Sequence, residues 1–258
     1  VAQISGDSTA YTDSIRWDSI SSVTGKLYNK ATPPSLLSNI FSFENKMFGI
    51  QGSNLYWSRL DTAAAWGAFD FVSLNRSDGD HNTVAYPARG VVRVHKNKSN
   101  FNVYQDANLN WNRREISGQF GCIAPQSHSA GLFGHYFLSE NGVLRESEGQ
   151  YLERTQQIKL VSAQLDNFDA LPLTTKAKAK SFYFDQKYML SIGDTTYVYD
   201  ERADAWTTWD FTFQDATYYG VEDVLGFYPG DTMYFIKPGD SLLYRYGSSE
   251  LDGNDTIA

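Results

Sequence analysis

The stretch SFYFDQKYMLSI, residues 181–192, decides the fold. Its two arms, 181–184 and 187–192, alternate large apolar side chains with smaller or more polar ones, which is the pattern of a half-buried strand. Only Asp185 and Gln186 separate the arms. A link that short can only reverse the chain into an antiparallel pair. The stretch is therefore predicted to be a β-hairpin.

Similar hairpins recur along the chain. KMFGI (46–50) and NLYWS (54–58) form another, joined by three residues. Aligning the hairpins gives a repeat of about 40 residues, a period that favours a propeller or a solenoid. The predicted units cover roughly residues 38–74, 83–116, 121–158, 176–211 and 217–246. The count is five, or six if the first 35 residues hold another unit.

A unit of about four short strands cannot bury its apolar face alone and must pack on its neighbours. Closing the units into a ring removes the end faces, and abundant aromatic side chains fill the wedges between blades. Aromatics make up 15% of the 258 residues. We therefore predict an all-β chain, a β-propeller of about five or six blades with one short helix. A β-sandwich is the alternative.

The one helix is predicted between Gln157 and Leu171. Apolar residues recur there every three or four positions, which is helical spacing, and the following Pro172 suits a helix end. The apolar positions in question are Ile158, Val161, Leu165, Phe168 and Leu171.

Composition excludes several classes of function. The formal charge is −8 and the basic residues are scattered, so no footprint for sequence-specific nucleic-acid binding is expected. No apolar run approaches the roughly 20 residues of a membrane span. The single cysteine, Cys122, excludes an internal disulfide framework and is predicted to be a buried free thiol.

Few residues suit metal binding, and no cofactor is expected. The acidic loop 75–82 offers Asp78 and Asp80 to a hard cation, but it lacks the later glutamate of an EF-hand, so a blade-connecting turn is the preferred interpretation. The histidines are too dispersed for a helix-borne metal pair, and each is expected to have a structural role. They are His81, His95, His128 and His135.

No catalytic residue is predicted, because the motifs of nucleophilic, kinase-like and zinc-protease chemistry are absent. Glycosidase chemistry is the one enzyme class that stays open, since paired carboxylates can come from distant blades. The sialidase-type repeat is nevertheless missing. Trp111, Trp206 and Trp209 could stack on sugars or on a partner protein, although packing between blades is preferred.

An ordered set of phrases resembles the propeller proteins of bacteriophage tails, including the nozzle or tail-tube components of short-tailed phages. LYWS (55–58) leads to Trp66 and FDFV (69–72); DGD (78–80) precedes VVRVHK (91–96) and FNVY (101–104). Then come GCIAPQS (121–127), YFLSENGV (136–143), and YVYDER (197–202) before AWTTW (205–209). The resemblance covers roughly residues 36–246, and its strength lies in the order of the phrases.

This resemblance implies a virion structural protein of the tail, made in the host cytoplasm and assembled with other tail or connector proteins. It implies a homo-oligomeric ring around or beside the path of the genome, and it carries over no catalytic residue. Residues 1–35 are expected to be an N-terminal extension or partial blade, 36–247 the propeller, and 248–258 a polar linker. A start at Val1 and a polar end suggest a fragment of a longer polypeptide.

Overall fold

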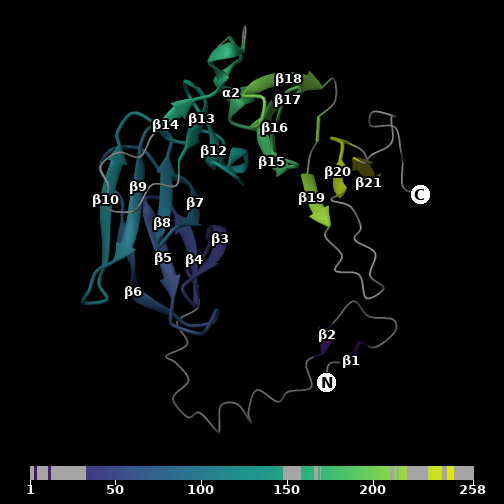
Figure 1. The fold of residues 1–258 in the computed structure, drawn as a ribbon. Coiled ribbons are helices and arrows are strands. Elements are labelled where there is room, and N and C mark those ends of the chain that lie inside the picture. Colours follow the sequence, from purple (N-terminus) through teal and green to yellow (C-terminus); the bar gives the residue numbers. More distant parts are fainter. Residues whose placement is uncertain are drawn as a thin grey trace.

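A computed structural model describes residues 3–4, 11–12, 33–147, 158–165, 168, 170–209, 212–213, 215–219, 232–239 and 243–246. Within these ranges the protein is built from antiparallel sheets, each formed by strands consecutive in sequence. The sheets follow one another around a central opening, with the first strand of each sheet toward the opening (Figure 1). This is the predicted all-β propeller, and we call each sheet a blade.

The blades match the predicted repeat units closely. Blade 1 holds β3 (Ser38–Phe43), β4 (Lys46–Gln51), β5 (Asn54–Ser58) and β6 (Trp66–Ser73). Blade 2 holds β7 (Asn82–Ala88), β8 (Val91–Lys96), β9 (Asn100–Gln105) and β10 (Trp111–Ser117). Blade 3 holds β11 (Ser129–Gly131), β12 (Gly134–Ser139), β13 (Gly142–Glu146) and β14 (Ile158–Leu160).

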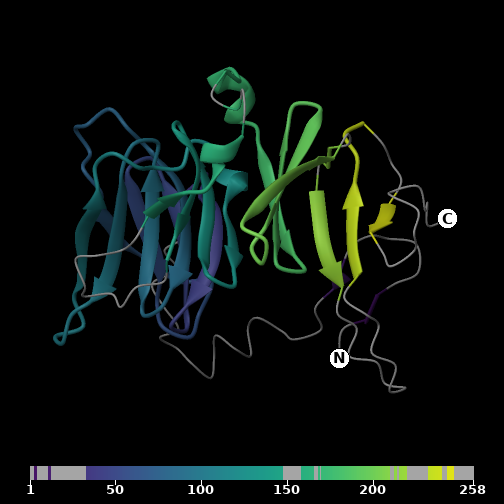
Figure 2. The ribbon, with the colours of Figure 1, turned by 45° about the horizontal axis from the view of Figure 1, so that its top comes forward.

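Blades 4 and 5 follow along the chain. Blade 4 holds β15 (Lys180–Phe184), β16 (Lys187–Ile192), β17 (Thr195–Asp200) and β18 (Ala205–Trp209). Blade 5 has three described strands, β19 (Asp215–Tyr219), β20 (Thr232–Ile236) and β21 (Leu243–Tyr246). The blades stand side by side when the molecule is tilted forward (Figure 2).

Tight turns set the register of the hairpins. Asp185 and Gln186 have φ of 47° and 57°, and β15 pairs with β16 directly across them, Phe184 opposite Lys187. Two successive positive φ values match a type I′ turn, whose twist suits the flanking strands. The hairpin predicted at 181–192 is therefore confirmed, turn included.

In blades 2, 3 and 4, alternate side chains of a middle strand enter two different junctions, because each of these blades packs between two others. In β16, Tyr188, Leu190 and Ile192 face blade 3, whereas Met189 faces blade 5. The same period of two sends Leu138 toward blade 4 and Phe137 toward blade 2. Both faces of such strands are buried, and each large side chain contributes roughly 1.5–3 kcal/mol by leaving water.

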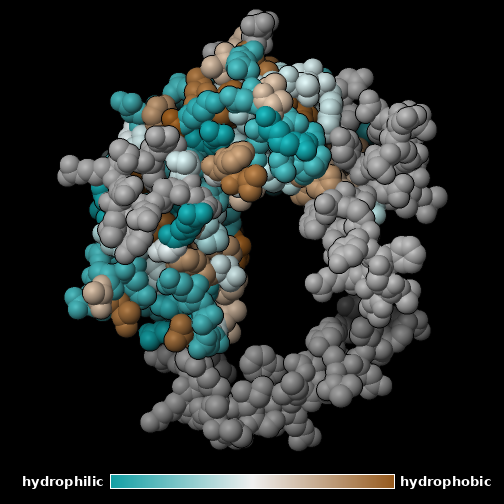
Figure 3. Space-filling model, viewed as in Figure 1, coloured by the Kyte–Doolittle hydropathy of each residue, from teal (hydrophilic) through white to brown (hydrophobic). Residues whose placement is uncertain are grey.

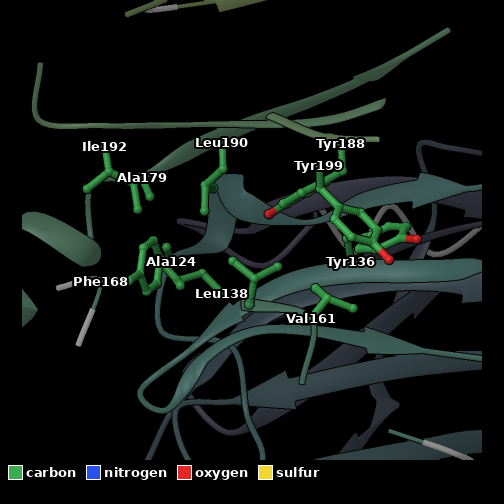
Figure 4. Close-up of a cluster of buried hydrophobic side chains, with 11 residues drawn as sticks. Ala124, Tyr136, Leu138, Val161, Phe168, Ala179, Tyr188, Leu190, Ile192 and Tyr199 are labelled. Atoms are coloured by element: carbon green, nitrogen blue, oxygen red, sulfur yellow. The ribbon is translucent and has the colours of Figure 1, made fainter. Parts of the chain in front are cut away.

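One apolar cluster fills each of the four junctions between successive blades. The cluster between blades 3 and 4 shows how: tyrosines from both blades meet at one end and aliphatic side chains at the other (Figure 4). Tyr136 stacks on Tyr188 with ring centroids 5.0 Å apart. The described blades are thus held together by wedges of apolar and aromatic side chains, as the composition predicts.

The predicted helix at 157–171 is wrong. Ile158–Leu160 form β14, which pairs with β13, and Ser162–Gln164 form only a short 3₁₀ turn, η2. Pro172 does not end a helix but precedes one, the four-residue α2 (Leu173–Lys176). The apolar spacing arises instead because this link runs across the junction of blades 3 and 4, where Val161 and Phe168 are buried. A second 3₁₀ turn, η1, spans Pro125–Ser127.

Some predictions fall outside the described residues. Most of the N-terminal extension does so, and so do all of the polar linker 248–258 and residues 148–157 of the third predicted unit. Within the first 35 residues, β1 (Gln3–Ile4) and β2 (Tyr11–Thr12) pair antiparallel. Among the helices of the described ranges, none is long and apolar enough to cross a membrane.

Candidate functional site

The acidic loop proposed for a metal is built around a lysine. Residues 74–81 connect β6 to β7, so the loop is a blade-connecting turn. Lys96, at the end of β8, has a fully buried side chain whose ammonium lies 2.7 Å from the Asp78 carboxylate. The same nitrogen donates to the carbonyl oxygens of Asn75 at 3.0 Å and Asp80 at 3.1 Å. The ammonium thus occupies the centre that a hard cation would take.

The second carboxylate of the loop also has protein partners. Asp80 accepts hydrogen bonds from the backbone and side chain of Asn97 and from the backbone of Lys98. Burial acts to raise the pKa of Asp78, but the hydrogen bond and charge of Lys96, together with backbone hydrogen bonds, lower that pKa overall. Across the described ranges, no three His, Cys, Asp or Glu side chains are grouped to hold a metal ion.

Three of the four histidines meet at the junction of blades 2 and 3. His128 stacks on the Tyr86 ring, with ring centroids 3.6 Å apart. His135 also stacks on the Tyr86 ring, with centroids 4.5 Å apart. The Tyr86 hydroxyl lies 2.8 Å from His95 Nε2, and His128 Nε2 lies 3.0 Å from His135 Nδ1. The structural role expected for these histidines is confirmed, but their gathering was not foreseen. His81 is exposed on the acidic loop.

A buried ion pair completes this group, which we call the junction 2–3 cluster: Tyr86, Arg93, His95, His128, His135 and Glu146. Arg93 of β8 contacts Glu146 of β13, and both residues are almost fully buried. The second oxygen of Glu146 lies 3.4 Å from the Tyr86 hydroxyl and 3.8 Å from His95 Nε2. These contacts run from strands of blade 2 to strands of blade 3, so the cluster holds the two blades in register.

Burial governs the protonation of the cluster. It lowers the pKa of His95 well below the usual range, helped by the nearby charge of Arg93. It also lowers the pKa of His128, with His135 as the second cause. Burial raises the pKa of Glu146, although Arg93 opposes this shift. Burial thus favours the neutral forms of His95 and His128 beside the Arg93–Glu146 ion pair.

Another carboxylate is committed to the junction of blades 3 and 4. Glu201 accepts a hydrogen bond from the Tyr136 hydroxyl at 2.6 Å and one from the Tyr183 hydroxyl. Burial, together with the acceptor Glu201, raises the pKa of both phenols. Glu146 and Glu201 are the buried carboxylates of the described ranges, and each joins a different pair of blades.

The tryptophans proposed for stacking are partly buried and pack within or between blades. Trp111 packs on Trp57 with centroids 5.4 Å apart, Trp206 donates its indole N–H to the Val161 carbonyl at 2.7 Å, and Trp209 packs on the cluster between blades 4 and 5. The preferred interpretation is confirmed. Cys122 is a buried free thiol as predicted, and burial raises its pKa to about 11.

The exposed apolar side chains point to a different kind of site. In an antiparallel blade, the links from the first to the second strand and from the third to the fourth lie at one end. The link from the second to the third strand and the link to the next blade lie at the other end. Two hydrogen bonds join the links at that other end: Leu74 N–H donates to the Ser53 carbonyl, and Cys122 N–H donates to the Lys96 carbonyl. Four large apolar residues lie on the links at this end, 52–73% exposed. They are Leu60, Leu109, Leu132 and Phe133, and we call them the turn face.

Hydrogen bonds fix the backbone of two of the links that carry the turn face. Leu132 donates its backbone N–H to the Tyr183 hydroxyl of the next blade at 3.1 Å. Beside Leu109, the Asp106 carboxylate accepts the backbone N–H groups of Asn108 and Asn110, each at 2.9 Å. Rigid presentation lowers the entropic cost of binding a partner. The visible side of the molecule carries separate brown apolar spots among hydrophilic residues (Figure 3).

The sequence matches no family model, and no curated protein matches it significantly. Solved structures do resemble it. A protein from Lactobacillus plantarum aligns with a TM-score of 0.50 and 11% identity, over 86% of this chain and 70% of that one. Hsv2 of Kluyveromyces lactis aligns at 0.49 with 8% identity, over 87% and 74%.

The WD40 domain of SCAP from fission yeast aligns with a TM-score of 0.47 and 12% identity, over 84% of this chain. This chain spans 57% of the length of that one. At such low identity, structural likeness bears on the fold alone. The blade pattern itself defines the class: the protein is an all-β propeller.

Proposed function

We propose that this propeller is a structural subunit of a bacteriophage tail that assembles with other tail or connector proteins around or beside the path of the genome. The order of sequence phrases supports the tail, and the turn face supports the binding. The turn face carries the proposal because it offers exposed apolar side chains on links of three successive blades. We infer that a partner covers these side chains together, since burial of exposed apolar groups stabilises protein–protein contacts.

The buried polar groups also favour assembly over hydrolysis. A glycosidase needs two carboxylates about 5–10 Å apart and open to substrate. Glu146 and Glu201 are instead enclosed and joined to Arg93 and to tyrosines. Their ion pair and hydrogen bonds connect neighbouring blades, which suits a subunit that must stay rigid within a larger assembly. The alternative, a carbohydrate-active propeller, would require a site built from other residues.

Reconstitution with the products of the genes that flank its own tests the proposal. The purified chain should form a ring or a defined complex with those proteins, measured by size-exclusion chromatography with light scattering. Leu132→Ser/Phe133→Ser should weaken the complex at least about tenfold while the chain stays folded. Leu173→Ser, which removes another exposed leucine, from α2, is the control and should bind like the wild type.

A chain that stays monomeric with the tail proteins at every concentration would refute the proposed role. Equal weakening by the control would refute the assignment of the turn face. The enzyme alternative is tested separately by release of reducing sugar from bacterial surface glycans. Measurable turnover that is lost when an acidic residue is replaced would favour that alternative instead.

A further inference from the structure

A cavity of about 490 Å³ lies between blades 4 and 5. Its walls come from α2 and the residues after it, from the turn between β16 and β17, and from the links before β19 and after β20. Each of these segments either leads to the next blade or joins the second strand of a blade to the third. Such links lie at the end of the blades opposite the turn face, so the cavity lies at that opposite end. Cavities of roughly 300–1,000 Å³ hold small ligands.

Hydroxyl groups and lysines line this cavity. No aspartate or glutamate is among its described lining residues, although the chain as a whole has 30 acidic residues and a charge of −8. Lys178, which is exposed, and Lys180 bring positive charge to the cavity. The hydroxyl groups belong to Thr174, Thr175, Ser191 and Thr212. Ammonium and hydroxyl donors together are suited to an oxyanion.

One wall of the cavity is apolar and firmly placed. Phe213 is 3% exposed, belongs to the cluster between blades 4 and 5, and donates its backbone N–H to Ser191 Oγ at 3.2 Å. Pro238 lines the cavity as well. Gly193 makes the β16–β17 turn with φ of 59°, and a Cβ added there would reach van der Waals contact with Thr175. An apolar wall beside hydroxyl donors fits a ligand that has both C–H and O–H groups.

We propose that this cavity binds a small hydroxylated anion of about monosaccharide size, a sugar that carries a phosphate or a carboxylate. Lys178 meets the acidic group, the hydroxyls meet the sugar hydroxyls, and the apolar wall packs against the C–H face of the ring. The site is separate from the turn face, so binding there does not depend on the proposed tail role.

Isothermal titration of the purified chain with glucose 6-phosphate and with glucuronate tests this site. Both should bind, and unmodified glucose should bind at least about tenfold more weakly, since a charge-assisted hydrogen bond is lost. Lys178→Gln should weaken both anions about tenfold. Lys98→Gln, which neutralises another exposed lysine, should bind like the wild type. Thr212→Val provides a second variant and should weaken the sugars without removing a charge.

Three results would overturn the proposal. One is the absence of binding by either anionic sugar at millimolar concentration. Another is an equal loss in Lys178→Gln and Lys98→Gln, which would indicate general charge attraction. The third is binding of inorganic phosphate as tight as that of glucose 6-phosphate, which would exclude a role for the sugar ring. Circular dichroism of each variant checks that it is folded.

Discussion

Replacing Glu146 by glutamine should strongly destabilise the propeller. The substitution keeps the shape of the side chain but removes the charge that balances Arg93, and these residues are only 1% and 3% exposed. Removing one partner of a buried ion pair leaves an uncompensated charge and costs roughly 3–5 kcal/mol. At about 2–4 °C per kcal/mol for a chain of this size, Tm should fall by roughly 6–20 °C.

The design needs a matched control and a rescue. Glu115→Gln removes an exposed carboxylate from β10 and should change the unfolding free energy by less than about 0.5 kcal/mol. The double variant Arg93→Met/Glu146→Leu removes both charges, and it should recover much of the loss because an apolar pair can replace a buried ion pair at little cost.

Urea unfolding, followed by tryptophan fluorescence, measures all four proteins. A loss below about 1 kcal/mol for Glu146→Gln would refute the reasoning, because it would mean that Arg93 is not held as a buried charge. A double variant no more stable than the single one would show that the residues do not act as a pair.

Lys96→Met should lower the free energy of unfolding in urea by roughly 2–4 kcal/mol, because the carbonyls and carboxylate of the acidic loop lose their central donor. Added calcium should leave the Tm of the wild type unchanged. A rise of several degrees would contradict the lysine-centred loop. Stability should fall as the pH drops below about 6.5, because burial lowers the pKa of His95 and His128 and the unfolded chain then binds more protons than the folded one. Glu146 has the opposite effect on stability. Burial raises its pKa above the usual value of 4.5, so above that pH the folded chain holds more protons than the unfolded one, and stability falls as the pH rises. Urea midpoints at about pH 7.5 and 5.5 measure the balance, and His128→Gln should flatten the dependence; equal slopes in both proteins would count against the histidine assignment. Gly134→Ala should destabilise by more than about 1 kcal/mol, since φ is 141° and an added Cβ would meet the Glu146 carbonyl oxygen at 2.1 Å; wild-type stability would show that this close approach is relaxed in solution.

The strands and their grouping could be predicted from sequence because they depend on local information. Alternating side chains and two-residue links such as Asp185–Gln186 specify a hairpin without reference to the rest of the chain. The helix prediction at 157–171 failed for the converse reason. Val161 and Phe168 are spaced by contacts with two blades, not by a helical turn.

The junction 2–3 cluster could not be predicted, because its members lie on strands that meet only after the blades pack. The stretch VVRVHK, 91–96, places Arg93 and His95 on one face, which in an isolated sheet would be the solvent face. In a propeller that face meets the next blade, and the whole strand is buried. Charged residues within a central strand of a predicted propeller are therefore a signal for buried pairs across a junction.

The central claim is that the turn face binds the partner, and hydrogen–deuterium exchange on the reconstituted complex tests it most directly. Binding should protect the backbone around Leu60, Leu109 and Leu132, which lie on links at one end of three blades. It should leave residues 97–99, on the opposite turn of blade 2, unchanged. Protection confined to that opposite end, or no protection of the three links in a complex that forms, would contradict the account.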